Sequence, residues 1–323
     1  MSQPDGSRLP APAVIYELLS RHVVGQHEAK ISVSAAASKH LALSRSGSLA
    51  KVSSHVLLIG PTGSGKSYMV ETLAAAMDVP AVFVDATTLT EAGYRGREID
   101  SIFEELVHAA HGDLSKAEQG IVFIDEFDKI RSRGGSERDI RGEGVQYSLL
   151  KILDGNDRVL SSETVGRSSQ ARVRSISTRG ILFIFAGAFS FVDSGTESIS
   201  DDICTLIPHG FIPELLGRIS LVIPLDSFDE AAVAEMIQSR FHELMSDYDA
   251  IFRQHGYRIG VTPDASRFLA CAAINSGLGL RHIRSSLDKL LLSALHRIWS
   301  NDVKSSVSPA NIVLADGRLQ LCL

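Results

Sequence analysis

One eight-residue segment combines three glycines, a lysine and two serines in a spacing that can bind phosphate. Its residues are Gly60, Pro61, Thr62, Gly63, Ser64, Gly65, Lys66 and Ser67, and they match the pattern G-x-x-x-x-G-K-[ST] in full. The glycines let backbone N–H groups turn toward phosphate oxygens without a Cβ in the way. Lys66 can neutralise the β and γ phosphates of a nucleotide, and the Ser67 hydroxyl can bind Mg²⁺. The segment therefore predicts a nucleoside triphosphate site.

A second segment places two carboxylates at the end of an apolar run. Asp125 and Glu126 follow the apolar residues 121–124. Asp125 can hold Mg²⁺ together with Ser67, and Glu126 can orient and deprotonate a water for attack on the γ-phosphate. Many strands end in acidic residues, so this pattern is informative only together with the phosphate loop. The pair indicates ATP hydrolysis rather than a small-molecule kinase, which would need no water-activating glutamate.

These two motifs require strands that end at the site and a helix that begins there. Short apolar runs predict strands at residues 55–59, 81–84, 121–124, 181–186 and 221–224. Helical patterns lie at residues 25–43, 68–77, 97–111 and 141–154. Strands that alternate with helices predict an α/β fold with a mostly parallel sheet covered by helices on both faces.

The pattern changes near Asp226. Residues 229–254, 263–275 and 279–300 are helical in pattern, with no buried-strand run between them, and a short β element is expected near residues 311–321. We therefore expect a flexible N-terminus at residues 1–12, a large ATP-binding domain at residues 13–225 and a small, mainly helical lid domain at residues 226–323.

Composition excludes several classes of protein. The chain has 323 residues, of which 44% are hydrophobic, so it can fill a sizeable core and is not mostly disordered. The 38 acidic residues outnumber the 32 basic ones, which argues against nucleic-acid binding and against a polybasic membrane surface. We also expect no membrane-spanning helix and no secretion signal. The three cysteines are scattered, which favours the reducing cytoplasm over a disulfide framework or a zinc knuckle.

Together with four further segments, the two nucleotide motifs resemble the AAA+ ATPases, and most closely their ClpX and HslU group of unfoldases. The four segments are residues 22–26 (HVVGQ), 85–94 (DATTLTEAGY), 141–146 (RGEGVQ) and 210–218 (GFIPELLGR). The resemblance covers most of the chain, from about Val23 to Arg284. It implies an AAA+ P-loop ATPase that uses ATP and Mg²⁺, forms a homohexameric ring and threads polypeptide substrates through a central pore.

The resemblance also implies a role for individual residues. Val23 and Val24 would line the adenine pocket, and Arg218 would be the arginine finger that reaches the γ-phosphate of the neighbouring subunit. Tyr94 would grip substrate in the pore, with the positive charge of Arg95 beside it. Arg281 matches the second arginine of the sensor-2 segment and would contact the nucleotide.

The sequence departs from this family at several places. Leu278 stands where the first sensor-2 arginine falls, so Arg281 or a neighbour such as Arg284 would have to compensate. Residues 189–209 lack the Ile-Gly-Phe tripeptide of the family, which makes docking to a ClpP-type peptidase doubtful, and the N-terminal zinc-binding domain is not found. Residues 158–179 hold several arginines among many serines and form either a flexible loop or a basic collar for a different substrate class.

These residues are compatible with two functions. The first is an ATP-dependent protein unfoldase, or remodelling chaperone, that acts without a peptidase. The alternative is a weakly hydrolysing, ATP-gated scaffold or assembly subunit of another machine, which the Leu278 departure favours. A nucleic-acid motor has little support because the acidic balance and the lack of interleaved basic and aromatic residues argue against it.

Overall fold

The computed structural model describes most of the chain in two compact units. The described residues are 11–45, 55–90, 97–132, 140–160, 174–192, 199, 202–276, 280–299 and 308–322. One unit runs as far as Leu225 and the other begins at Asp226, with the short stretch Thr62–Ser64 grouped with the second. No helix in the described ranges is both long and apolar enough to cross a membrane.

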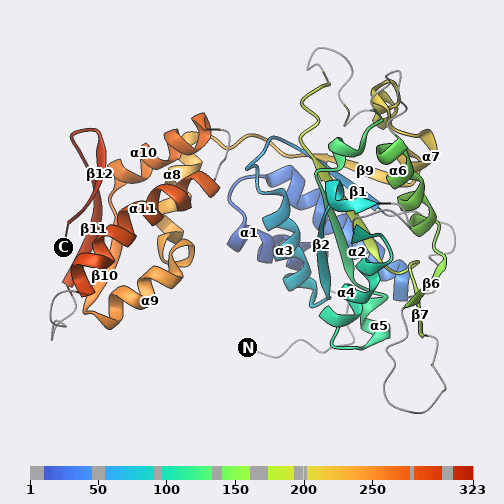
Figure 1. Ribbon diagram of the computed structural model, residues 1–323, viewed down its shortest axis with the longest axis horizontal. Coiled ribbons are helices and arrows are strands. Elements are labelled where there is room, and N and C mark those ends of the chain that lie inside the picture. Colours follow the sequence, from blue (N-terminus) through green and yellow to red (C-terminus); the bar gives the residue numbers. More distant parts are fainter. Residues whose placement is uncertain are drawn as a thin grey trace. The chain divides into compact units, whose positions relative to one another are not determined.

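A five-stranded parallel sheet forms the centre of the first unit (Figure 1). Its strands are β1 (His55–Ile59), β2 (Ala81–Asp85), β5 (Ile121–Asp125), β8 (Leu182–Gly187) and β9 (Ile219–Pro224). They lie in the order β2-β5-β8-β1-β9, and every neighbouring pair is parallel. This confirms the predicted α/β fold with a mostly parallel sheet.

Helices bury both faces of this sheet, which is why its strands read as continuous apolar runs. The first face packs against α1 (Pro12–His22), α2 (His27–Arg45) and α3 (Lys66–Met77). The second packs against α4 (Ser101–Ala109), α5 (Leu114–Ala117), α6 (Ile140–Leu153) and α7 (Pro213–Leu216). Successive strand residues alternate between the faces, as in β1, where Val56 and Leu58 join the first cluster and Leu57 the second.

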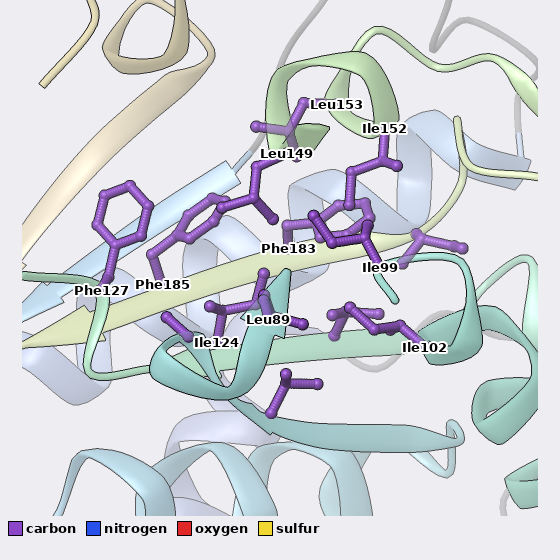
Figure 2. Close-up of a cluster of buried hydrophobic side chains, with 14 of the residues drawn as sticks. Leu89, Ile99, Ile102, Ile124, Phe127, Leu149, Ile152, Leu153, Phe183 and Phe185 are labelled. Atoms are coloured by element: carbon purple, nitrogen blue, oxygen red, sulfur yellow. The ribbon is translucent and has the colours of Figure 1, made fainter. Parts of the chain in front are cut away.

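Figure 2 shows part of the second cluster, with Phe183 and Phe185 of β8 beside Leu149 and Ile152 of α6. All four side chains are almost fully buried. Each contributes roughly 1.5–3 kcal/mol to folding through apolar burial. This packing holds the strands in place. The phosphate loop follows the end of β1, and Asp125 is the last residue of β5.

Short elements connect the main layers. They are the 3₁₀ helices η2 (Ala86–Thr88), η3 (Phe127–Ile130) and η4 (Ile203–His209), the paired strands β3 (Leu89–Thr90) and β4 (Arg97–Glu98), and the hairpin strands β6 (Asp157–Leu160) and β7 (Arg174–Ser177). The hairpin lies at the two ends of the region predicted as a flexible loop or basic collar, so part of that region is regular antiparallel strand. Helix α1 was also not predicted, and its first residue, Pro12, falls at the end of the predicted flexible N-terminus.

The second unit is mainly helical, as predicted. It contains α8 (Glu230–Leu244), α9 (Ser246–Gln254), α10 (Pro263–Asn275), α11 (Leu280–Trp299) and a sheet of β10 (Tyr257–Val261), β11 (Ser308–Ala315) and β12 (Arg318–Cys322). The expectation of no strand among the helices was wrong. Strand β10 is short, but its alternating Tyr257 and Ile259 are buried, and it pairs in parallel with β11. Pairing with a strand far along the chain leaves no local signal in the sequence.

Candidate functional site

The phosphate-binding segment connects β1 to α3 at the carboxyl edge of the sheet, where ligands of open α/β folds bind. Gly63 and Gly65 have φ values of +84° and +90°, which only glycine adopts without strain. Gly65 is the N-cap of α3, so the unpaired N–H groups at the start of that helix lie beside the loop. Ser64 is buried, whereas Pro61 and Thr62 are exposed. The backbone shape is therefore that of an anion cradle.

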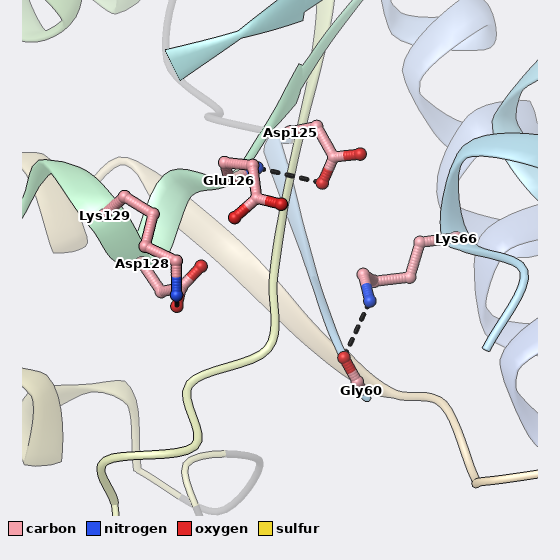
Figure 3. A network of polar contacts seen from close by, with 6 residues as sticks. All are labelled: Gly60, Lys66, Asp125, Glu126, Asp128 and Lys129. Carbon is pink, nitrogen blue, oxygen red and sulfur yellow. Dashed lines mark hydrogen bonds and ion pairs between the residues drawn. The ribbon is translucent and has the colours of Figure 1, made fainter. Parts of the chain in front are cut away.

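Lys66, the first residue of α3, is buried, and its side chain folds back onto the loop (Figure 3). Its Nζ donates hydrogen bonds to the carbonyl oxygens of Gly60 at 2.7 Å and Pro61 at 2.9 Å. Burial lowers the pKa of this ammonium, and nearby carboxylates, led by Asp125, oppose that shift. Lys66 thus brings a positive charge into a site that is already partly shielded from water.

The two predicted motifs meet through a direct hydrogen bond. The Ser67 hydroxyl donates to Oδ2 of Asp125 at 3.0 Å, although the two residues come from α3 and the end of β5. Hydroxyl and carboxylate oxygens are the ligands that Mg²⁺ prefers. The structure therefore brings together the two residues that the sequence predicts as magnesium ligands.

Glu126 follows Asp125 in a strained backbone conformation. Its φ of +54° lies in the left-handed region, which costs a residue other than glycine about 1–3 kcal/mol. Its N–H donates to Oδ1 of Asp125 at 2.9 Å. Burial raises the pKa of the Glu126 carboxyl, and the negative charges of Asp128 and Asp125 raise it further. The turn holds an exposed carboxylate, whose affinity for a proton is increased, beside the lysine and aspartate of the site (Figure 3).

Asp128 is a site residue that the sequence prediction missed. Its side chain is fully buried, and Oδ2 lies 2.8 Å from Nζ of Lys129. It packs against Gly187 at the end of β8, where a Cβ would come within 2.9 Å of Asp128 Oδ1. The carbonyl of Gly187 in turn accepts the N–H of Gly60 at 3.2 Å. The only available signal was a second aspartate shortly after Glu126, and its contact with β8 is not local.

Arg218 lies apart from this cluster, at the amino end of the sheet. It directly precedes Ile219 of β9, which pairs with His55 at the start of β1. The phosphate loop follows the other end of β1, five residues away, or roughly 16 Å at the usual rise of a strand. Arg218 forms an ion pair with Asp154 at 2.5 Å, and both side chains are more than one-third exposed. The structure does not place the predicted arginine finger at the phosphate site of its own chain.

The amino end also holds a buried imidazole. The pKa of His55 is lowered to about 3, chiefly by burial and also by the nearby charges of His40 and Arg218, and a hydrogen bond to the backbone of Leu153 opposes the shift. The ring packs edge-on against Phe183. His55 is thus neutral at ordinary pH and belongs to the core beneath Arg218.

The segment predicted to bind adenine begins at the end of α1. Val23 is buried and Val24 is half-buried, and Val23 belongs to the same hydrophobic cluster as α3, which follows the phosphate loop. Nζ of the buried Lys30 donates to the carbonyl oxygen of Val23 at 3.2 Å. Gly25 and Gln26 both have positive φ values, so the chain turns sharply into α2.

Three predicted residues remain, together with Arg284, the suggested substitute for the missing sensor-2 arginine. Tyr94 and Arg95 lie outside the described residues. Arg281 is the second residue of α11, and its side chain also lies outside the described part. Arg284, the suggested substitute, donates to the Leu244 carbonyl oxygen at 3.2 Å and pairs with Asp247. Arg284 is therefore engaged within the second unit.

The parallel sheet, the glycine loop with its buried lysine and the Ser67–Asp125 contact define a P-loop nucleoside triphosphatase. The chain matches the AAA domain family (Cdc48 subfamily) over residues 51–222. A protein of Wolinella succinogenes named "ATP-dependent Clp protease ATP-binding subunit ClpX 2" is 34% identical over 94% of this chain and 81% of its own length. The ClpX subunits of Borrelia duttonii and Porphyromonas gingivalis are 34% and 32% identical, over 91% and 93% of this chain and 76% and 80% of their own lengths.

The chain belongs to the AAA ATPases and, within them, to the ClpX family. The predicted resemblance is confirmed, and the protein is an ATPase of the Clp chaperone type.

Proposed function

We propose that this protein is an ATP-driven polypeptide unfoldase that works as a homohexameric ring in the cytoplasm. Each subunit would bind ATP at its own phosphate loop, and Arg218 of the next subunit would complete the hydrolytic site. The position of Arg218 carries the proposal. A side chain at the amino end of β9 is separated from its own phosphate loop by the length of β1, whereas a neighbouring subunit can bring it to that loop.

The residues at the carboxyl edge fit ATP and Mg²⁺. The loop N–H groups and Lys66 would hold the phosphates, and the Ser67–Asp125 oxygen pair would hold the ion, which neutralises phosphate charge when bound. Glu126 would accept a proton from water as the water oxygen bonds to the γ-phosphorus and the bond to the bridging oxygen breaks. Arg218 from the neighbour would stabilise the negative charge that develops on the leaving group and the transferred phosphoryl. Val23, Val24 and Arg281 would contact the base and the phosphates.

The threading step would depend on Tyr94 and Arg95. An aromatic side chain between two glycines can grip peptides of many sequences by packing, and the charge of Arg95 would favour acidic segments. The relatives are named as ATP-binding subunits of an ATP-dependent protease. Because residues 189–209 lack the Ile-Gly-Phe tripeptide, we propose that this ring acts on polypeptides without a ClpP-type peptidase.

Mixed rings test the shared site. Glu126→Gln removes the base and Arg218→Ala removes the finger, so each variant alone should have almost no ATPase activity while it still binds ATP. When the two variants are mixed, an intact Glu126 on one subunit can face an intact Arg218 on the next. We expect the mixture to hydrolyse ATP well above either variant alone. A mixture as inactive as its components would contradict an active site shared between subunits.

A weakly hydrolysing, ATP-gated scaffold is the second candidate. It is favoured by Leu278 in the sensor-2 segment and by the pairing of Arg284 with Asp247. Tyr94→Ala separates the two candidates when unfolding of a tagged reporter is measured beside ATP hydrolysis. An unfoldase should lose reporter unfolding and keep hydrolysis. A wild-type protein that does not unfold any reporter would favour the scaffold.

A further inference from the structure

Gln146 is a fully buried amide in the middle of α6, with 0% of its surface exposed. Its Nε2 donates to the carbonyl oxygens of Ile130 and Gly210, both at 3.0 Å. Its Oε1 accepts the N–H of Ile212 at 2.9 Å. Two acceptors face the nitrogen and one donor faces the oxygen, so the surroundings allow only one orientation of the amide. Such a group specifies the positions of its partners, because any displacement leaves buried polar atoms unpaired.

The three partners belong to the two segments that carry the catalytic groups. Ile130 is the last residue of η3, the turn that begins directly after Glu126. Gly210 and Ile212 begin the segment that leads through α7 to Arg218. The N–H of Ser132 also donates to the Gly210 carbonyl at 2.9 Å. Gly210 has a φ of +96°, and a Cβ there would come within 2.0 Å of the Ser132 carbonyl oxygen. The two backbones therefore approach as closely as a glycine permits.

Aromatic packing joins the same two segments beside the amide. Phe127, the residue after Glu126, lies 5.3 Å from Phe211 between ring centroids. Phe127 also lies 4.6 Å from Phe185 of β8, and Phe211 lies 5.9 Å from Phe189. Apolar contacts of this kind hold segments together without fixing their register closely. The directional bonds of Gln146 supply that register.

We infer that Gln146 is a positioning residue that couples the Glu126 turn of one active site to the Arg218 segment that serves the next. The inference rests on the proposed function, because it requires Arg218 to act in a neighbouring subunit. A movement of the Glu126 turn at one site would be transmitted through the amide to the finger at another. Gln146 touches neither the phosphate loop nor Lys66 in the contacts described above. Its loss should therefore slow hydrolysis and leave ATP affinity unchanged.

Kinetics of two substitutions give the first test. Gln146→Met keeps the size of the side chain and removes all three hydrogen bonds, and Gln146→Glu keeps the acceptor for Ile212 but loses both donations. We expect each to lower kcat at least about tenfold with KM and Kd for ATP within about twofold of wild type. His40→Leu is the matched control, since it breaks one buried side chain–backbone bond, to Gly180, on the other face of the sheet. It should leave kcat nearly unchanged.

Mixed rings give the decisive test. In rings of Glu126→Gln and Arg218→Ala subunits, the first kind supplies only the finger. Adding Gln146→Met to the Glu126→Gln subunits should abolish the rescue, although those subunits have no active base to lose. A rescue that persists would overturn the inference and leave the proposed function standing. If the parent mixture shows no rescue, both fall. Loss of ATP binding in both Gln146 variants would also overturn it, because the amide would then only maintain the fold.

Discussion

The two ends of the central sheet differ in the chemistry they carry. At the carboxyl end, hydrogen bonds join Ser67, Asp125 and Glu126, and the backbone at Glu126 is strained. At the amino end, a neutral buried His55 lies beneath Arg218, which is half-exposed and paired with Asp154. Strain and charge therefore collect where the nucleotide would bind, whereas at the amino end a half-exposed cationic side chain lies where a second molecule could reach it. In the proposed function, one reaction uses residues from the opposite ends of the sheet, contributed by two neighbouring subunits.

The largest expected effect is at the carboxyl end. Glu126→Gln removes the carboxylate that we propose as the base without changing the size of the side chain, and we expect ATP hydrolysis to fall by about 10³-fold. ATP binding should stay near wild type, because Lys66 and the loop are untouched. Steady-state hydrolysis together with equilibrium binding of a fluorescent ATP analogue measures both quantities. A variant that retains more than a tenth of the rate would remove Glu126 from the role of base.

At the amino end, His55 should instead make the free energy of unfolding depend on pH in the acidic range. The folded state lowers the pKa of His55 from 6.5 to about 3, so the unfolded chain binds the proton more readily. The contribution of His55 to stability is complete above pH 6.5 and is lost as the pH falls toward 3. It should decrease by about 2 kcal/mol between pH 7 and pH 5.

Urea unfolding followed by far-UV circular dichroism measures this loss, because the single tryptophan, Trp299, lies in the second unit. His55→Leu provides the comparison. Its stability should depend less steeply on pH over that range than the stability of the wild type. Equal slopes would show that His55 is not the group responsible.

Alanine substitutions at two glycines compare how tightly the two ends of the sheet are packed. A Cβ at Gly187 would come within 2.6 Å of the Phe189 ring and 2.9 Å of Asp128 Oδ1, whereas at Gly217 the nearest atom would be 3.4 Å away. Gly187→Ala should therefore destabilise the protein by about 1–3 kcal/mol and lower hydrolysis by displacing Asp128. Gly217→Ala should change the stability by less than about 0.5 kcal/mol. Thermal unfolding of both variants measures the contrast, and equal tolerance would contradict the tight packing at the carboxyl end.

The smallest expected effect concerns the ion pair of Arg218. Both partners are more than one-third exposed, so Asp154→Asn should cost less than about 1 kcal/mol of stability. Hydrolysis should change by less than about threefold, since Arg218, the proposed finger, remains. A large increase in the ATPase rate would show instead that Asp154 holds Arg218 away from the neighbouring site.

The amino-acid sequence predicted the parts of the site that are continuous in the chain. The residues from Gly60 to Ser67 need only a strand before them and a helix after them. Asp125 and Glu126 need only the end of an apolar strand. The pattern of the apolar residues also predicted the strands of the sheet and the helix at residues 279–300, because burial on two faces or on one face leaves a local pattern.

Tertiary structure alone decided which of these segments meet. The strand order and the register of Ile219 beside His55 place Arg218 at the end opposite the phosphate loop. The contact of Asp128 with Gly187 and the three hydrogen bonds of Gln146 join residues far apart in the chain. Such pairings depend on how whole helices and strands pack, so no short stretch of sequence contains them. The sequence by itself determined that the chain is an ATPase with a phosphate loop, and the packing decided that Arg218 lies at the end of the sheet opposite that loop.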